Sequence, residues 1–296
     1  MLGDGVNVLD PHLTWNLVED VRQVLEYPFM VNAFRAGTIV AVLAGLVGWF
    51  MVLRKQSFAG HTLAVVGFPG AAGALLVGVS ATYGYFVFAI LTAVLIALLP
   101  TSGRSGGGLG EESAVTGTIQ AFALACGFLF VSLYGGFVSG LDALLFGSFL
   151  GITAAQVWVL LAVASVAVLL LAGMGRPLLF ASLDPAVAQA RGIPVRFLSV
   201  AFLVLLGVAA AEVSQITGTL LVFALLVVPA ATAQSLTARP AASLALTLAV
   251  GLLVTWLSLF VAYYSPYPIG FFLTSLAFAA YLLAGGWRRV RPGRAS

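Results

Sequence analysis

The chain has 296 residues, of which 61% are hydrophobic and only 8% are charged, and its mean hydropathy is +1.12. Soluble domains carry about 25% charged residues, so this composition excludes a chain that covers itself with a water-compatible surface. The formal net charge of +3 says nothing about nucleic acid, because the basic residues lie mainly between apolar runs, and we expect no nucleic-acid partner. We therefore expect an integral membrane protein with lipid as its solvent.

The N-terminal segment, residues 1–30, is polar and acidic. It lacks the basic start and apolar core of a signal peptide. Between residues 13 and 27 the apolar side chains follow a helical stripe, which predicts an amphipathic helix at the membrane interface. His12 precedes this stripe; it either helps to attract cations or is an ordinary solvated side chain.

A series of apolar runs follows, each close to the roughly 20 residues that one membrane crossing needs. They predict an all-α integral membrane protein: one polytopic bundle of about eight or nine transmembrane helices over residues 31–287, followed by a basic cytoplasmic tail at 288–296. The runs cover residues 31–53, 59–80, 82–99, 114–134, 154–174, 194–216, 217–237, 241–263 and 268–287.

The orientation follows from the excess of Lys and Arg in cytoplasmic loops. With nine crossings, most basic residues fall on one side together with the C-terminal tail, so the acidic N-terminal segment lies outside the cytoplasm. Arg22 and Arg35 are the exceptions. The side assigned to the cytoplasm holds Arg54, Lys55, Arg104, Arg176, Arg191, Arg196, Arg239 and the arginines from Arg288 onward.

Two common kinds of site are excluded. The single cysteine, Cys126, cannot form a disulfide within the chain or a cysteine-cluster metal site. The glycine-rich stretch 101–113 is not a phosphate-binding loop, because that motif ends in Gly-Lys-Ser/Thr, whereas the only lysine is Lys55. A nucleophile–base pair is also not visible, so we expect no enzymatic activity of the chain itself.

One loop between the fifth and sixth runs carries ordered helix signals. Asp184 suits an N-cap, Pro185 the first helical position, and Gly192 the C-terminal stop. Together they predict a cytoplasmic helix of about two turns, containing Ala188 and ending near Arg191. Such a helix either docks into a cytoplasmic partner and transmits its motion, or is a surface helix of no special role.

Four stretches resemble motifs of a known family, in the same order and spacing. They are Phe50–Ser57, Gly67–Gly70, Leu183–Ile193 and Gln215–Ala233. They look like the first inter-helix junction, the second-helix signature, the coupling-helix loop and the most recognisable stretch of ABC importer permeases for zinc, manganese and iron. The resemblance runs from about Phe29 to the last span.

This resemblance implies a bacterial cell (inner) membrane permease that works as a homodimer. Two ATP-hydrolysing subunits would bind below it, at the helix that begins at Asp184, and a metal-binding extracytoplasmic protein would bind above it. Zn²⁺ or Mn²⁺ would be the transported substrate, ATP would be consumed by the partner, and the chain would hold no permanent cofactor.

The chain departs from the family where a metal ligand is expected. The family commonly has an aspartate and, four residues later, a histidine on the second helix, a spacing that places two ligands on one face. Here the positions hold His61 and Val65, and we expect His61 and the adjacent Thr62 to line the translocation path. His61 either contacts the ion, alone or with its copy across a dimer axis, or is a hydrogen-bonded interfacial histidine.

Three further polar residues could serve the path. Glu212 is an acidic residue inside the later apolar runs, and Gln215 follows it by one helical turn. Carboxylates within membranes usually face a cavity or a partner, so a cation path is one reading and a charge in a short external turn is the other. Asp142, in the outer loop, either receives the metal or its binding protein, or caps a helix.

Two other transport functions remain open. The loss of the Asp/His pair favours a permease for a chelated metal or another small solute. A secondary transporter driven by an ion gradient usually buries several ionisable groups in mid-membrane, and this chain has few. Uptake that disappears in His61→Ala would favour the metal ion, and uptake without any ATPase would favour the secondary transporter.

Overall fold

The computed structural model describes residues 16–98, 109–134, 144–145, 147, 149–219 and 221–290. His12, Asp142, most of the glycine-rich stretch and the end of the C-terminal tail lie outside these ranges. All regular structure within them is helical, which confirms the predicted fold class.

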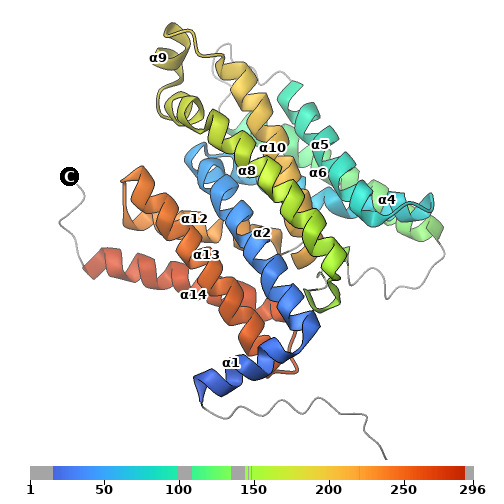
Figure 1. Ribbon diagram of the computed structural model, residues 1–296. Coiled ribbons are helices and arrows are strands. Elements are labelled where there is room, and N and C mark those ends of the chain that lie inside the picture. Colours follow the sequence, from blue (N-terminus) through green and yellow to red (C-terminus); the bar gives the residue numbers. More distant parts are fainter. Residues whose placement is uncertain are drawn as a thin grey trace, which may run out of the picture.

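The helices form one bundle between two ends marked by short helices (Figure 1). Helix α9 lies at one end, where it joins α8 to α10, and α1 lies across the other. The helices are α1 (Leu17–Glu26), α2 (Pro28–Leu53), α3 (Ser57–Val65), α4 (Gly67–Leu76), α5 (Ala81–Leu98), α6 (Leu109–Tyr134), the 3-10 helix η1 (Phe149–Gly151), α8 (Ala154–Leu183), α9 (Pro185–Ala190), α10 (Val195–Thr217), α11 (Val222–Leu226), α12 (Val228–Leu236), α13 (Pro240–Tyr263) and α14 (Ile269–Val290).

Within the described ranges, eight helical segments are long and apolar enough to cross a membrane. This agrees with the predicted eight or nine. The run expected at 217–237 differs, because it forms two short helices, α11 and α12, instead of one spanning helix. Gly218, with φ +76°, ends α10 before it.

Proline explains where two helical segments break. A proline ring clashes with the carbonyl four residues earlier and supplies no N–H to it. Pro69 therefore disrupts the helix at Val65, where α3 ends, and Pro229 acts on Leu225, next to the end of α11. Thus α3–α4 forms one crossing with an internal break a few residues before Pro69. The break between α11 and α12 likewise lies a few residues before Pro229.

Close backbone contacts hold the centre together, because small residues let membrane helices approach closely. Gly70 on α4 and Gly84 on α5 face each other so closely that a Cβ on either would collide with the other's backbone. Likewise, a Cβ on Gly48 of α2 would collide with the carbonyl oxygen of Leu226 on α11. Helix α11 is therefore pressed directly against α2.

Helix α1 confirms the predicted amphipathic segment. Its N-cap, Asn16, accepts a hydrogen bond from the Val18 N–H at 3.3 Å. The Tyr264 hydroxyl, just after α13, lies 3.0 Å from the Asp20 carbonyl and 3.1 Å from Gln23 Oε1. Burial and the nearby Asp20 raise the pKa of Tyr264. Helix α1 is thus fastened to the bundle while Val18 remains exposed, as expected of a helix lying on a lipid surface.

Candidate functional site

The short helix α9 has the predicted caps. The Asp184 carboxylate accepts a hydrogen bond from the Val187 N–H at 3.0 Å, and Pro185 occupies the first turn. At the other end, Gly192 adopts φ +79°, a conformation that glycine tolerates best, and the Ile193 N–H closes the turn on the Ala188 carbonyl at 3.1 Å. The local structure expected from the sequence is confirmed.

One side chain anchors α9 and the others face outward. Ala188 is fully buried and belongs to the main hydrophobic core. Asp184, Pro185 and Arg191 are exposed. The Arg191 guanidinium lies 5.9 Å from the centre of the Phe180 ring on α8, which fixes the C-terminal end of α9 against the preceding helix. The result is a rigid projection that displays an exposed face.

Arg54, at the C-cap of α2, connects the two helices that flank α9. Its guanidinium donates to Ser182 on α8 at 3.1 Å and to Ser199 on α10 at 2.7 Å, and its Nε donates to Gln56 at 3.1 Å. It also lies 5.4 Å from the Phe202 ring centre. Burial lowers the pKa of the Arg54 guanidinium. A movement of α9 that displaces α8 or α10 would therefore pull on the junction between α2 and α3.

His61 lies one turn inside α3, and it is half-buried. Its ring meets the Phe223 ring of α11 edge-on, with centroids 5.6 Å apart. Among the described residues, neither ring nitrogen has a hydrogen-bond partner, so the predicted alternative of a hydrogen-bonded interfacial histidine gains no support. Val65, one turn further along α3, is buried and offers only methyl groups.

Thr62 points to a different neighbour. Its side chain is fully buried, and its hydroxyl donates to Gln120 Oε1 on α6 at 2.8 Å. This bond joins α3 to α6, so the hydroxyl is already used in contact between helices. The sequence placed Thr62 beside His61 in the path; in the structure the two neighbours serve different interfaces.

Glu212 lies on the buried face of α10, in the part of the helix that leads to its end at Thr217. The side chain is fully buried, which rules out the alternative of a charge exposed in an external turn. Neither carboxylate oxygen has a hydrogen-bond partner among the described residues. The Gln215 side chain donates to the Ala211 carbonyl of its own helix at 3.5 Å, its one hydrogen bond among the described residues. An unpartnered buried carboxylate is costly, and such groups mark functional positions in membrane helices.

These candidates are not gathered into one metal-binding cluster. Within the described ranges, no three His, Cys, Asp or Glu side chains lie close enough to share an ion. No described contact joins His61 to Glu212. What they share is the segment between α10 and α12: Glu212 precedes it on α10, and Phe223 within it covers the ring of His61.

A comparison with protein-family models identifies the family of the chain. The family model described as "ABC 3 transport family" matches residues 26–286. The chain belongs to this family. It is a multi-pass membrane protein, in agreement with its apolar helices.

Known members support this placement. The manganese transport system membrane protein MntC of Halalkalibacterium halodurans is 31% identical over 224 residues, 76% of this chain and 75% of the relative. The manganese import system permease protein ScaB of Streptococcus parasanguinis is 28% identical, covering 88% of this chain and 92% of the relative. The ABC 3 resemblance proposed from the sequence is therefore confirmed.

Solved structures agree on the fold. PsaBC from Streptococcus pneumoniae, in complex with Fab, superposes with a TM-score of 0.79 at 26% identity, covering 90% of this chain and 95% of that one. An inward-facing putative metal-chelate type ABC transporter superposes with a TM-score of 0.68 at 20% identity, covering 97% and 94%. The second likeness concerns the fold alone.

Sequence reasoning missed the role of Arg54 in this ABC 3 chain. It counted Arg54 only as a cytoplasmic charge and as part of a motif. The signal that could have found it is local: an arginine at the end of a membrane helix can extend back to polar groups on its neighbours, and Ser182 and Ser199 stand on both sides of the short helix.

Proposed function

We propose that the chain is the permease subunit of an ATP-driven importer in a bacterial cell membrane, and that it forms the path for a divalent transition metal, manganese or zinc. The observation that carries this proposal is the ABC 3 match over residues 26–286, together with relatives named as manganese import permeases. Two copies form the path, with separate ATPase subunits on one side and an extracytoplasmic binding protein on the other.

His61 is the proposed contact for the ion. Imidazole is a ligand that suits zinc and other transition metals. The ring nitrogens have no protein partner among the described residues, so they are available without breaking a hydrogen bond. Because each protomer supplies one imidazole, the two copies of His61 together give the pair of ligands that one protomer lacks. Glu212 supplies a further carboxylate along the path.

Helix α9 is the proposed contact for the ATPase. Its exposed face would dock into a cleft of that subunit. Because Ala188 is buried in the main core, a movement of α9 would be passed on to the bundle. Arg54 then transmits the movement from α8 and α10 to the junction that begins α3. Since His61 stands on α3, the motor and the path are mechanically linked.

The test is uptake of manganese by vesicles that contain the whole importer. His61→Ala should lower uptake by about tenfold or more, because the loss of one interaction of about 1.4 kcal/mol is a factor of ten. The matched control is His12→Ala, which removes the chain's other histidine and should leave uptake unchanged. Glu212→Gln, which keeps the shape of the side chain, should also lower uptake. Normal uptake by His61→Ala would overturn the role of His61.

A chelated metal is the second candidate substrate. Val65 at the usual histidine position, and the lack of a three-ligand cluster among the described residues, favour a ligand that brings its own donors. Competition between free manganese and a small metal chelate in the same vesicles separates the two. If the chelate is transported and His61→Ala has no effect, the substrate is the complex and not the bare ion.

A further inference from the structure

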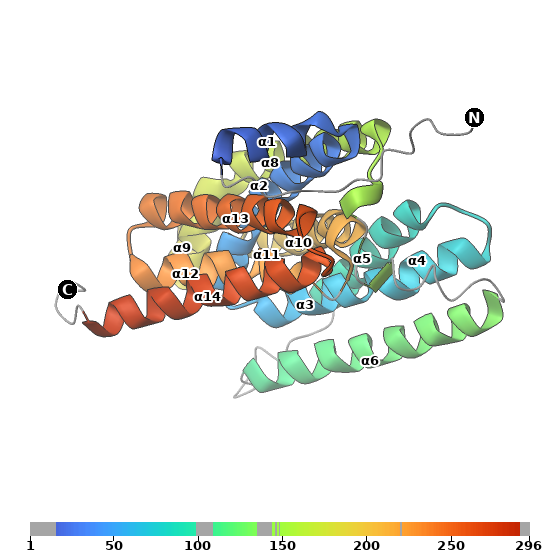
Figure 2. The ribbon, with the colours of Figure 1, turned by 90° about the horizontal axis from the view of Figure 1, so that it is seen from below.

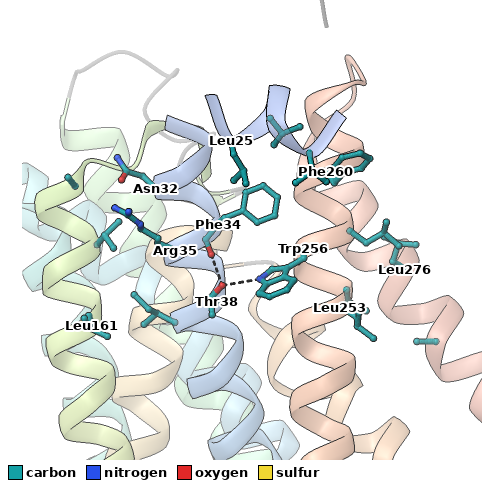
Figure 3. Close-up of a pocket in the computed structure, with 18 of the residues that line it drawn as sticks. Leu25, Asn32, Phe34, Arg35, Thr38, Leu161, Leu253, Trp256, Phe260 and Leu276 are labelled. Carbon is teal, nitrogen blue, oxygen red and sulfur yellow. Dashed lines mark hydrogen bonds between the residues drawn. The ribbon is translucent and has the colours of Figure 1, made fainter. Parts of the chain in front are cut away.

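An apolar groove with a volume of about 1260 Å³ lies beside α2 (Figure 3). Side chains of α1, α2, α8, α13 and α14 line it. Its volume exceeds the roughly 300–1,000 Å³ of pockets that enclose drug-sized molecules. Its walls are mainly hydrocarbon, including Leu25, Phe34, Leu161, Leu253, Phe260 and Leu276.

One charge interrupts this hydrocarbon surface. Arg35 lies on α2 where the groove passes between α2 and α8 (Figure 3). It is seven residues beyond Pro28, so its backbone is about 10 Å along the helix from the end marked by α1. The side chain is exposed, and among the described residues it has no hydrogen bond or ion pair. A lone charge at this depth in a membrane is costly unless it finds a partner.

The other polar groups of the groove are already engaged. Asn32 donates to the Ile152 carbonyl at 3.3 Å. The Trp256 indole N–H donates to the Thr38 hydroxyl at 2.9 Å, and that hydroxyl donates to the Phe34 carbonyl at 2.7 Å. The described lining residues include no Asp or Glu. The described lining of the groove therefore offers Arg35 no counter-charge.

We propose that the groove binds an anionic phospholipid, with its acyl chains along the apolar walls and its phosphate on Arg35. The guanidinium fork matches the geometry of phosphate oxygens. The apolar length suits acyl chains, and helix α1 lies at the level of the headgroups. A bound anionic lipid would also explain why Arg35 lies away from the side of the membrane where most of the basic residues were expected. The proposal needs only the membrane location, so it does not depend on the identity of the transported substrate.

The test measures lipid binding to the purified full-length chain. Native mass spectrometry compares retention of phosphatidylglycerol and phosphatidylcholine supplied in equal amounts. The wild type should prefer phosphatidylglycerol. Arg35→Ala should reduce this preference by about fivefold, the equivalent of one basic residue facing anionic lipid. Arg35→Lys should keep part of it, and Arg22→Ala, the matched control on α1, should keep all of it.

A second variant tests the groove without touching the charge. Leu253→Trp fills part of the apolar wall and should reduce retention of both lipids, while the thermal midpoint confirms that the variant is folded. The proposal is overturned if Arg35→Ala leaves the preference unchanged, if Arg22→Ala reduces it equally, or if folded Leu253→Trp retains lipid like the wild type.

A second copy of the chain is the competing occupant. In a Cys126→Ala background, Leu161→Cys places one thiol in the groove. Efficient disulfide dimers of this variant in phosphatidylglycerol-containing membranes would assign the groove to a subunit interface and overturn the lipid proposal. Monomeric Leu161→Cys with normal lipid preference would support it.

Discussion

The end of the bundle at α9 and the centre around His61 are held together by different means. At the α9 end, polar side chains join separate helices: Arg54 reaches Ser182 and Ser199, and Asp184 caps α9. In the centre, glycines bring backbones into contact, as where Gly48 meets Leu226, and neither His61 nor Glu212 has a hydrogen-bond partner among the described residues.

The difference shows how one membrane protein can be both firmly assembled and open to a polar substrate. Close backbone packing stabilises the centre, beside a few hydrogen bonds such as that of Thr62 to Gln120. The packing of these central helices against one another therefore does not depend on His61 or Glu212. At the α9 end, charge-assisted hydrogen bonds from Arg54 join α2 to α8 and α10. Four substitutions test this division, in order of expected effect.

The largest effect is expected from Gly48→Leu. The new side chain would collide with the backbone of α11 at Leu226, which cannot move away as a flexible side chain could. We expect destabilisation of about 3 kcal/mol or more, seen as a low yield of folded protein and a lower thermal midpoint. Gly173→Leu on α8 is the control, because a Cβ there meets nothing within 4 Å. Equal loss in both variants would contradict the packing role of Gly48.

Arg54→Ala should have the next largest effect. It removes hydrogen bonds from a charged donor to two helices, each worth about 1.5–3 kcal/mol. We expect uptake to fall by about tenfold while the partner ATPase still hydrolyses ATP, because the motor is then disconnected from α3. Lys55→Asn is the matched control: it removes the neighbouring charge, and asparagine tolerates the φ of 58° at that position. Coupled transport in Arg54→Ala would refute the mechanical link.

Asp184→Ala should cost less, about 1 kcal/mol, the usual value of an N-cap. The loss falls on α9 alone, so faster hydrogen exchange at the α9 amides should accompany a small decrease in transport. Asp184→Asn keeps the acceptor oxygen and should behave like the wild type. If Asn and Ala are equally impaired, the charge matters and not the cap.

The smallest effect is expected from Thr62→Val. Its bond to Gln120 is the polar link of the centre between α3 and α6. Hydrogen bonds between membrane helices average about 0.6 kcal/mol in double-mutant cycles. Thr62→Val combined with Gln120→Leu should give a coupling energy near this value. A coupling energy between Thr62 and Gln120 as large as the about 1.5–3 kcal/mol expected for a charged donor such as Arg54 would contradict the distinction between the two regions.

Much of the fold follows from local sequence signals. Apolar length predicted the crossings, and Asp184, Pro185 and Gly192 predicted the caps of α9, because these effects depend on neighbours in the chain. The run at 217–237 was predicted as one helix and proved to be two. A hydropathy pattern indicates that a segment is apolar but not that it forms one continuous helix. The position of Pro229 was the feature of the sequence that indicated a break.

The candidate site was less predictable because it depends on contacts between distant segments. The sequence indicated His61 and Glu212 as polar residues in apolar runs, but it did not reveal that Phe223 covers one or that the other lacks a partner. The Thr62 bond to Gln120 and the Arg54 network join residues on different helices. The position of Arg54 at a helix end was a local sign that it would bond its neighbours, but the sequence did not specify that Ser182 and Ser199 would be the partners.

Helix α6 lies at the edge of the bundle beside α3 (Figure 2). Most of its spanning surface has no protein cover, and Phe122, Phe128 and Leu129 are exposed. Only a narrow strip is tightly fitted: a Cβ on Gly127 would lie 2.8 Å from the Phe68 ring. We expect the two faces of α6 to tolerate amino-acid substitutions to different degrees. Substitutions at the exposed positions of α6 should disturb the packing of this chain little, whereas any side chain at Gly127 would press on the buried Phe68 ring.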